Sequence, residues 1–266
     1  MSQPIVAGCD VGSIWAKAVI FDGKEILASA VIPSSPFPAK TAEKVLEKAA
    51  NKAGVSMGDI EYVVGTGYGR VNVPNAKKTV SEIACHAKGA AWSCSDVATL
   101  IDVGGQDCKV ISLASDGHGR VMDFSMNDKC AAGTGRFLEV MAGVFELPIE
   151  EFGERALKAE RILGISSQCT VFAESEVVCL IAQGHEIEQI IAGICDAVAA
   201  RVSVLVPRVG LREKVYMSGG VAKNIGVRQA LQRRLRVTIW ELTEDPLIIG
   251  ALGAAVLAMD ALRQQQ

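Results

Sequence analysis

The stretch Asp102-Val103-Gly104-Gly105-Gln106-Asp107 directly follows the apolar run Val97 to Ile101, and a related stretch, Asp10-Val11-Gly12-Ser13, stands in the same setting near the N-terminus. In both, a Gly is the second residue after the Asp and a Lys is the seventh, Lys17 or Lys109. A second apolar run and an Asp-Gly pair follow each Lys. A duplicated unit of strand, turn, strand and hairpin is the simplest account of this repeat.

The residues of the repeat suit an anionic ligand. Gly lets backbone N–H groups approach phosphate closely, and an Asp at the end of an apolar strand can hold the water shell of Mg²⁺ beside phosphates. A single Asp-x-Gly is more often an ordinary hairpin turn. Because the pattern recurs with matched spacing, we predict two phosphate loops that face one nucleotide from opposite sides.

Composition narrows the class of protein. The chain of 266 residues is long enough for two domains, and its formal charge of −3 without a basic run argues against nucleic acid or anionic membrane as a partner. The N-terminus lacks a basic region typical of secretory signals, and the longest nearly uncharged apolar stretch, Pro246 to Met259, is too short to span a bilayer. We therefore expect a soluble, cytoplasmic protein.

Eight cysteines are more than a cytoplasmic chain of this size needs for structure. Their number suggests metal binding or redox chemistry. The sequence contains no Cys-x-x-Cys pair, so a locally encoded zinc or ferredoxin-type site is not indicated.

Alternating hairpins, crossover strands and helices predict an α/β chain with two similar domains and a nucleotide in the cleft between them. We place the first domain at residues 1–95 and the second at 96–266, with part of the helix expected at 246–266 packing back on the first. A helix is predicted over Thr41 to Ala53, with Thr41 as its N-cap, and another over Ala222 to Leu235.

A third glycine-rich segment, Gly65 to Arg70, superficially suggests a dinucleotide loop. Pro74 follows where a helix should be running, and no acidic residue ends a second strand at the usual distance. The nicotinamide interpretation is therefore disfavoured.

The duplicated Asp-x-Gly hairpins and the turn Gly219-Gly220-Val221 resemble the acetate and sugar kinase, Hsp70 and actin superfamily, whose domains are ribonuclease H-like. Three stretches narrow the resemblance to the ATP-dependent activators of 2-hydroxyacyl-CoA dehydratases, the ATPase subunits of benzoyl-CoA reductases and the reductases of double-cubane-cluster proteins. These stretches are Asp102–Asp107, Asn127–Phe137 and Cys169–Glu176. The resemblance covers essentially the whole chain.

This resemblance implies a homodimer with one [4Fe-4S] cluster on its two-fold axis, held by Cys130 and Cys169 of each subunit. The count agrees with the chain, because a four-iron cluster takes four thiolates and symmetry doubles the two that each chain supplies. The resemblance also implies that ferredoxin or flavodoxin donates one electron. ATP hydrolysis then drives its transfer, at very low potential, to an iron–sulfur partner enzyme.

We assign site residues from the hairpin pattern and, for Gln106, by analogy with other water-positioning glutamines. Asp10 and Asp102 are assigned to the magnesium shell, and Gln106 to orienting the attacking water. The remaining nucleotide contacts are assigned to the first hairpin (Gly12, Ser13, Lys17), the second hairpin (Gly104, Gly105), the loop after Cys130 (Gly133, Gly135) and the adenosine border (Gly219, Gly220, Asn224, Gly250). For Gly250, plain helix packing is an equally good explanation.

Two other functions share these loops. A small-molecule kinase of the superfamily would have no use for the two cysteines. A nucleotide-binding sensor would assemble with nucleotide but show negligible turnover.

Overall fold

The computed structural model describes residues 3–165 and 170–265. The chain folds into two compact units, which are described separately. Unit 1 comprises Met1–Ala98, Leu113–Met122 and Leu242–Gln266, and unit 2 comprises Thr99–Ser112 and Asp123–Glu241. The segment Leu113–Met122 was expected in the second domain, whereas its contacts place it in unit 1.

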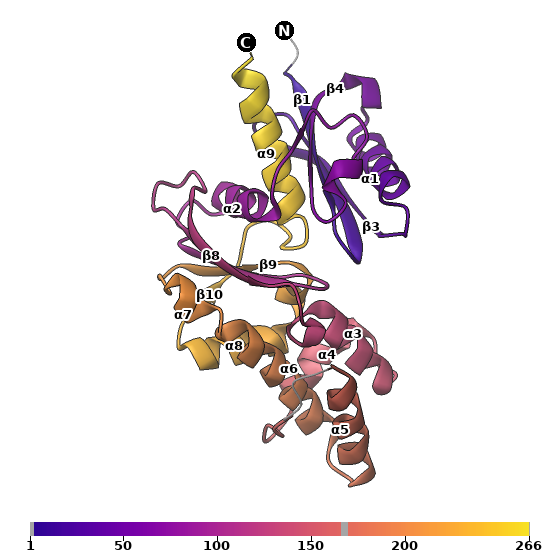
Figure 1. The fold of residues 1–266 in the computed structure, drawn as a ribbon, viewed down its shortest axis with the longest axis vertical. Helices are drawn as coiled ribbons and strands as arrows, with labels where there is room; N and C mark the ends of the chain where they lie inside the picture. The colour runs from indigo at the N-terminus through magenta and orange to yellow at the C-terminus, as the bar shows by residue number, and fades with distance from the viewer. Residues whose placement is uncertain (1–2, 166–169, 266) are drawn as a thin grey trace. The chain divides into compact units, whose positions relative to one another are not determined.

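Unit 1 is built on a five-stranded sheet with the strand order β3-β2-β1-β4-β5 (Figure 1). Strand β1 pairs antiparallel with β2 and parallel with β4. The strands are β1 (Ile5–Val11), β2 (Trp15–Phe21), β3 (Ile26–Pro33), β4 (Ile60–Thr66) and β5 (Lys78–Thr79). The helices are α1 (Pro38–Ala53), α2 (Glu82–Ser93) and α9 (Ile249–Arg263), with short 3-10 turns η1 (Met57–Asp59) and η2 (Arg70–Asn72).

Helix α1 packs Val45, Leu46 and Ala49 into the core of unit 1. The predicted start at Thr41 is wrong, because the helix begins at Pro38, whose ring fixes a helical φ in the first turn. The Thr41 hydroxyl instead donates to the carbonyl oxygen of Phe37 at 3.1 Å from within the helix.

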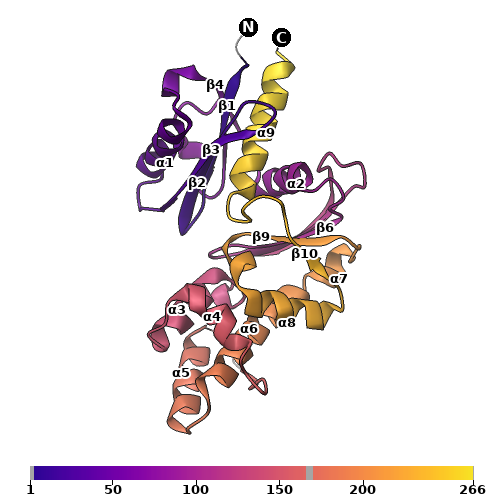
Figure 2. The same cartoon turned by 180° about the vertical axis from the view of Figure 1, so that it is seen from behind.

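Helix α9 lies alongside β1 and α2, as both views show (Figures 1 and 2). Its small residues permit this approach. A Cβ on Gly253 would lie 1.7 Å from the carbonyl oxygen of Cys85, and one on Gly8 of β1 would lie 2.0 Å from that of Ala251. These backbones touch, so the C-terminal helix is an integral part of unit 1.

Unit 2 is built on a second five-stranded sheet, with the order β10-β9-β6-β7-β8. The strands are β6 (Thr99–Val103), β7 (Cys108–Leu113), β8 (Val121–Asn127), β9 (Val215–Ser218) and β10 (Ile239–Trp240). The helices are α3 (Gly135–Val144), α4 (Ile149–Ala156), α5 (Thr170–Ala182), α6 (Ile187–Ser203), α7 (Val206–Val209) and α8 (Ile225–Leu235), with the 3-10 turns η3 (Ala131–Gly133) and η4 (Gly220–Lys223).

The two sheets have the same topology. In each, the first strand pairs antiparallel with the second and parallel with the strand that follows the crossover. Asp10 lies opposite Lys17, as Asp102 lies opposite Lys109. The repeat in the sequence therefore corresponds to one structural unit built twice.

The core of unit 2 is formed by helices packed against its sheet. Phe137, Leu138 and Met141 of α3 are buried as one stripe. The stretch Ile187–Val209 is long and apolar enough to cross a membrane by length and composition alone. However, it packs into this core with residues such as Ile194 buried, as the central helix of a water-soluble domain does.

Candidate functional site

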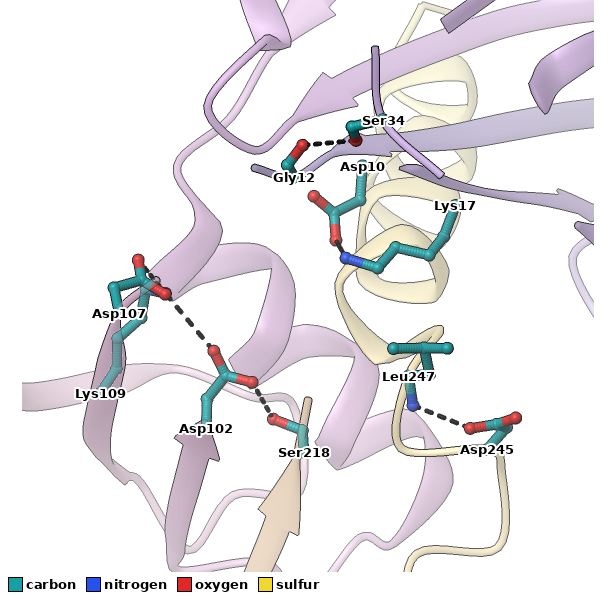
Figure 3. A network of polar contacts seen from close by, with 10 residues as sticks. All are labelled: Asp10, Gly12, Lys17, Ser34, Asp102, Asp107, Lys109, Ser218, Asp245 and Leu247. Carbon is teal, nitrogen blue, oxygen red and sulfur yellow. Dashed lines mark hydrogen bonds and ion pairs between the residues drawn. The ribbon is translucent and has the colours of Figure 1, made fainter. Parts of the chain in front are cut away.

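The first hairpin joins β1 to β2 and holds a buried ion pair. The Nζ of Lys17 lies 3.0 Å from Oδ2 of Asp10, a carboxylate that is only 4% exposed (Figure 3). The turn closes with the N–H of Gly12 donating to the carbonyl oxygen of Trp15. The hydroxyl of Ser34 donates to the carbonyl oxygen of Gly12 at 2.7 Å, which ties the hairpin to the end of β3.

Glycine backbones enclose the Asp10 carboxylate. A Cβ on Gly67, which has φ +90°, would lie 2.5 Å from Asp10 Oδ1. A Cβ on Gly250, in the first turn of α9, would lie 3.0 Å from Asp10 Oδ2 and 2.8 Å from Nε2 of His86. A side chain at either position would therefore displace the carboxylate. Gly250 therefore lets α9 pack closely against Asp10 and His86.

The second hairpin joins β6 to β7 and carries a larger polar network. Asp102 accepts a hydrogen bond from the Ser218 hydroxyl at 2.8 Å, and the Lys109 ammonium lies 3.4 Å from its other oxygen. The same ammonium lies 2.7 Å from Asp107 (Figure 3). All four side chains belong to residues that are at most 4% exposed. Gln106, at the tip of the turn, is exposed.

The structure extends the repeat to residues that the sequence analysis missed. Thr66 lies opposite Asp10 at the end of β4, and Ser218 lies opposite Asp102 at the end of β9. A glycine with positive φ follows each, Gly67 or Gly219. In the sequence, both places show a hydroxyl residue followed by Gly at the end of an apolar strand. This pattern could have indicated the two residues, but each lies far along the chain from the Asp that it faces.

Gly219 repeats the role of Gly67. Its φ is +84°, and a Cβ would lie 2.3 Å from the carbonyl oxygen of Val103 and 2.9 Å from Asp102 Oδ1. Gly220 then opens the turn η4. Asn224 caps α8, since its Oδ1 accepts from the N–H of Val227 at 3.0 Å. The predicted helix start at Ala222 is wrong, because 222 lies within η4 and the helix begins after the Asn224 cap.

The tip of the second hairpin is hydrogen-bonded to the start of α3. The N–H of Gly135 donates to the carbonyl oxygen of Gly104 at 2.9 Å, and that of Arg136 donates to Gly105 at 2.8 Å. A Cβ on Gly135 would lie 3.3 Å from the oxygen of Gly104. Gly135 therefore contacts the tip of the second hairpin directly.

Cys130 precedes this helix start. It is half-buried and occupies the cap position of the turn η3, which includes Gly133 and leads directly into α3. The side-chain amide of Asn127 donates to the carbonyl oxygen of Cys130 at 3.3 Å, and the Thr134 hydroxyl donates to that of Ala131 at 2.6 Å. Both hydrogen bonds lie within the segment that joins β8 to α3.

The second predicted cluster ligand, Cys169, lies outside the described residues. Burial raises the pKa of the thiols of Cys85, Cys108 and Cys195 to about 12, and raises that of Cys9 further, so these four remain neutral thiols. Cys94 is half-buried and Cys179 is exposed. Within residues 3–165 and 170–265, no three His, Cys, Asp or Glu side chains are grouped to hold a metal ion.

Comparison with known proteins identifies the family. Residues 7–258 match the model of the BadF/BadG/BcrA/BcrD ATPase family. The chain is 46% identical over 260 residues to the 2-hydroxyisocaproyl-CoA dehydratase activator of Clostridioides difficile, covering 97% of this chain and 96% of that protein. It is 45% identical over 258 residues to the (R)-2-hydroxyglutaryl-CoA dehydratase activating ATPase of Acidaminococcus fermentans, covering 94% and 95%.

Solved structures agree. The 2-hydroxyisocaproyl-CoA dehydratase activator from Clostridium difficile with bound ADPNP superposes with a TM-score of 0.93 at 44% identity, covering 98% of this chain and 97% of that one. A ROK family glucokinase from Streptomyces griseus, 14% identical, superposes with a TM-score of 0.54 over 96% and 99% of the two chains and shares the fold alone. The predicted α/β fold with duplicated actin-like units is confirmed. The predicted family is confirmed as well: the chain belongs to the BadF/BadG/BcrA/BcrD ATPase family and is an ATPase.

Proposed function

We propose that this ATPase couples ATP hydrolysis to the delivery of single electrons from a [4Fe-4S] cluster to an iron–sulfur partner enzyme, and that it works as a homodimer. One observation carries the proposal. The tip of the second hairpin accepts two backbone hydrogen bonds from the start of α3, and the chain leading into that helix contains Cys130. A movement of the hairpin is thereby passed to a cluster ligand.

The first hairpin suits phosphate and magnesium. The backbone of Gly12 and Ser13 would approach phosphate oxygens, and the Lys17 ammonium would pair with them. Asp10 would hold the water shell of Mg²⁺. Its carboxylate oxygens are the ligand type that Mg²⁺ prefers, and the absence of a Cβ at Gly67 and Gly250 lets the carboxylate keep its position.

The second hairpin supplies the equivalent groups. Asp102 would hold magnesium-bound water, Gly104 and Gly105 would approach phosphate, and Gln106 would orient the attacking water. The water oxygen forms a bond to the γ-phosphorus while the bond to the ADP oxygen breaks. The products are ADP, inorganic phosphate and a proton. The exposed position of Gln106 leaves its amide accessible for this role.

Other glycines shape the surroundings of these groups. Gly219 and Gly220 bring backbone close to Asp102, and we assign them, with Asn224, to the adenosine border. Asn224 already caps α8 through its Oδ1, so a contact with adenosine would use its amide nitrogen or its backbone. Gly133 and Gly135 would act through the second hairpin, which Gly135 contacts.

Cys130 and Cys169 would hold the cluster, two thiolates from each subunit. Cys130 fits this role, because it is half-buried and lies in the short segment that leads into α3. When bound, the cluster supplies the one-electron carrier, which a ferredoxin or flavodoxin reduces and the partner enzyme oxidises. The buried neutral thiols elsewhere in the described chain are poor competitors for iron.

The acceptor belongs to the class of enzymes that the relatives activate. Two relatives are named for the 2-hydroxyisocaproyl-CoA and (R)-2-hydroxyglutaryl-CoA dehydratases, and another is part of the benzoyl-CoA reductase of Thauera aromatica. We therefore propose a 2-hydroxyacyl-CoA dehydratase as the acceptor, with a benzoyl-CoA reductase or a double-cubane-cluster protein as the alternatives, in the cytoplasm.

The test is anaerobic reconstitution with iron and sulfide. The wild-type protein is expected to bind one [4Fe-4S] cluster per dimer, visible by absorbance and electron paramagnetic resonance (EPR). Cys130→Ala and Cys169→Ala should each lose it while still binding ADP. Cys179→Ala, an exposed cysteine on α5, is the matched control and should keep the cluster. A colourless, iron-free wild type that phosphorylates a small molecule would refute the proposal in favour of a kinase. Nucleotide-dependent assembly without turnover would favour a sensor.

A further inference from the structure

The two hairpins carry different residues at the position that closes the turn. They share the same register and the same turn, because Gly12 N–H donates to the carbonyl of Trp15 and Gly104 N–H donates to that of Asp107. Asp107 therefore stands where the first hairpin has Trp15. Trp15 is 40% exposed, whereas Asp107 is 4% exposed and points into the polar network of unit 2 (Figure 3).

This difference changes the partner of the lysine. In the first hairpin, the Lys17 ammonium lies 3.0 Å from Asp10. In the second, the Lys109 ammonium lies 2.7 Å from Asp107 but 3.4 Å from Asp102. A short charge-assisted hydrogen bond is much stronger than a long one, so Lys109 is held chiefly by Asp107.

The two lysines also differ in exposure. The side chain of Lys17 is 13% exposed and that of Lys109 is 3% exposed. Lys17 is thus the better placed to meet a phosphate group. The buried Lys109 lies within 3.4 Å of both carboxylates and balances part of their charge.

We propose that Asp107 is a positioning residue for the carboxylate of Asp102. By taking up the Lys109 ammonium, it leaves Asp102 charged and oriented toward magnesium-bound water, and the Ser218 hydroxyl fixes the other Asp102 oxygen. Without Asp107, the same ammonium would pair with Asp102, as Lys17 pairs with Asp10, but the buried Lys109 could not leave its carboxylate for phosphate as the more exposed Lys17 could. This inference deepens the proposed function and rests on the magnesium role given there to Asp102.

The experiment uses Mn²⁺ as the probe, titrated into the full-length protein in the presence of ADP and followed by the EPR signal of free Mn²⁺. Asp107→Asn keeps the volume of the side chain and removes its charge. It is expected to raise the Kd for Mn²⁺ at least tenfold. Asp116→Asn, on an exposed turn where Asp116 pairs with Arg120, is the matched control and should bind Mn²⁺ like the wild type.

A second pair of variants separates positioning from a structural role. Lys109→Met removes the competing ammonium, so the double variant D107N/K109M is expected to recover Mn²⁺ affinity to within about threefold of the wild type. A merely structural role predicts a double variant at least as weak as D107N. Lys109→Met alone should bind Mn²⁺ at least as tightly as the wild type. If circular dichroism shows that D107N does not fold, the Mn²⁺ affinity of Lys109→Met tests the proposal in its place.

The outcomes distinguish the magnesium role of Asp102 from the positioning role of Asp107. If Asp102→Asn binds Mn²⁺ as well as the wild type does, the magnesium role of Asp102 is wrong. If Asp102→Asn is weak but D107N is not, or if the double variant fails to recover, only the role of Asp107 is overturned. Weaker Mn²⁺ binding by Lys109→Met alone has the same meaning.

Discussion

The backbone nitrogen of Gly135 donates a hydrogen bond to the carbonyl oxygen of Gly104 at 2.9 Å, and its neighbour Arg136 donates to Gly105. The first turn of α3 is thereby fastened to the tip of the second hairpin. An α-helix has unsatisfied N–H groups at its N-terminus, and here the hairpin satisfies two of them. The hairpin and the segment from Cys130 to α3 are therefore expected to move together.

This link predicts an uncoupled variant. Gly135→Pro removes one donor and places a ring carbon against the Gly104 oxygen, while proline suits the first position of a helix and the extended Thr134 before it. The variant is expected to keep its cluster and hydrolyse ATP, but the EPR signal of its reduced cluster should no longer change when ADP is exchanged for ATP. Gly143→Ala, at a position with open space, should retain the change. A full nucleotide response in Gly135→Pro would contradict the link.

Nucleotide affinity should depend on Lys17. Lys17→Met removes a cation that we assign to phosphate, and a charge-assisted hydrogen bond is worth about 1.5–3 kcal/mol. The Kd for ADPNP, measured by isothermal titration calorimetry, is therefore expected to rise roughly 10- to 100-fold. Lys24→Met changes an exposed lysine of the next turn and should leave the Kd unchanged. Equal affinities for Lys17→Met and the wild type would remove Lys17 from the site.

Stability should fall at alkaline pH because of the buried thiols. Burial raises the pKa of Cys195 from 9.0 to about 12, so between these values the unfolded chain has lost a proton that the native state keeps. The free energy of unfolding then decreases by about 1.4 kcal/mol per pH unit for each such thiol. The stability that the buried Cys195 thiol contributes is fully present below pH 9 and is lost as the pH rises toward 12.

Cys195→Ala isolates this effect. Between pH 8 and pH 10.5, urea unfolding under reducing conditions should show a loss of stability that is roughly 2 kcal/mol smaller than in the wild type. For each protein, the loss is calculated from its own free energy of unfolding at pH 8, so that a difference in overall stability between the variant and the wild type does not enter the comparison. Parallel pH profiles for the two proteins would show that Cys195 ionises equally in both states.

The packing of α9 predicts a large difference between two helical glycines. A Cβ on Gly253 would lie 1.7 Å from the carbonyl oxygen of Cys85, so Gly253→Ala must push α9 away from α2. Overpacking of this kind typically costs about 1–3 kcal/mol, and contact with a backbone atom places the variant at the upper end or beyond. Gly143→Ala meets open space in α3 and should gain up to about 1 kcal/mol from helix propensity. Thermal unfolding would contradict this argument if the two variants had similar Tm values.

The sequence predicted the hairpins well because their structure is local. Asp10 and Lys17 are seven residues apart, and the antiparallel register that joins them follows from a short turn between two apolar runs. The same holds for Asp102 and Lys109. The helix start at Thr41 was predicted wrongly, since a good capping residue was preferred to the proline that precedes it.

The long-range members of the same network could not be predicted. Ser218 donates to Asp102 across a separation of 116 residues, through a parallel pairing of β6 with β9. Parallel strands need long connections, so nothing in the local pattern around Ser218 indicates its partner. Gly67 was considered only as part of a dinucleotide loop, although the structure places it against Asp10.

The sequence by itself determined that one Asp-x-Gly hairpin, with a Lys at the seventh position after the Asp, occurs twice, and which family the chain belongs to. Only the tertiary structure decided that Lys109 lies closer to Asp107 than to Asp102, that the C-terminal helix, expected to pack on the first domain, does so against β1 and α2, and that α3 hydrogen-bonds to the hairpin tip. The physical reason is the range of the interactions. Hairpin register is set by neighbouring residues, whereas the choice among buried partners depends on which distant backbones the folded core brings together.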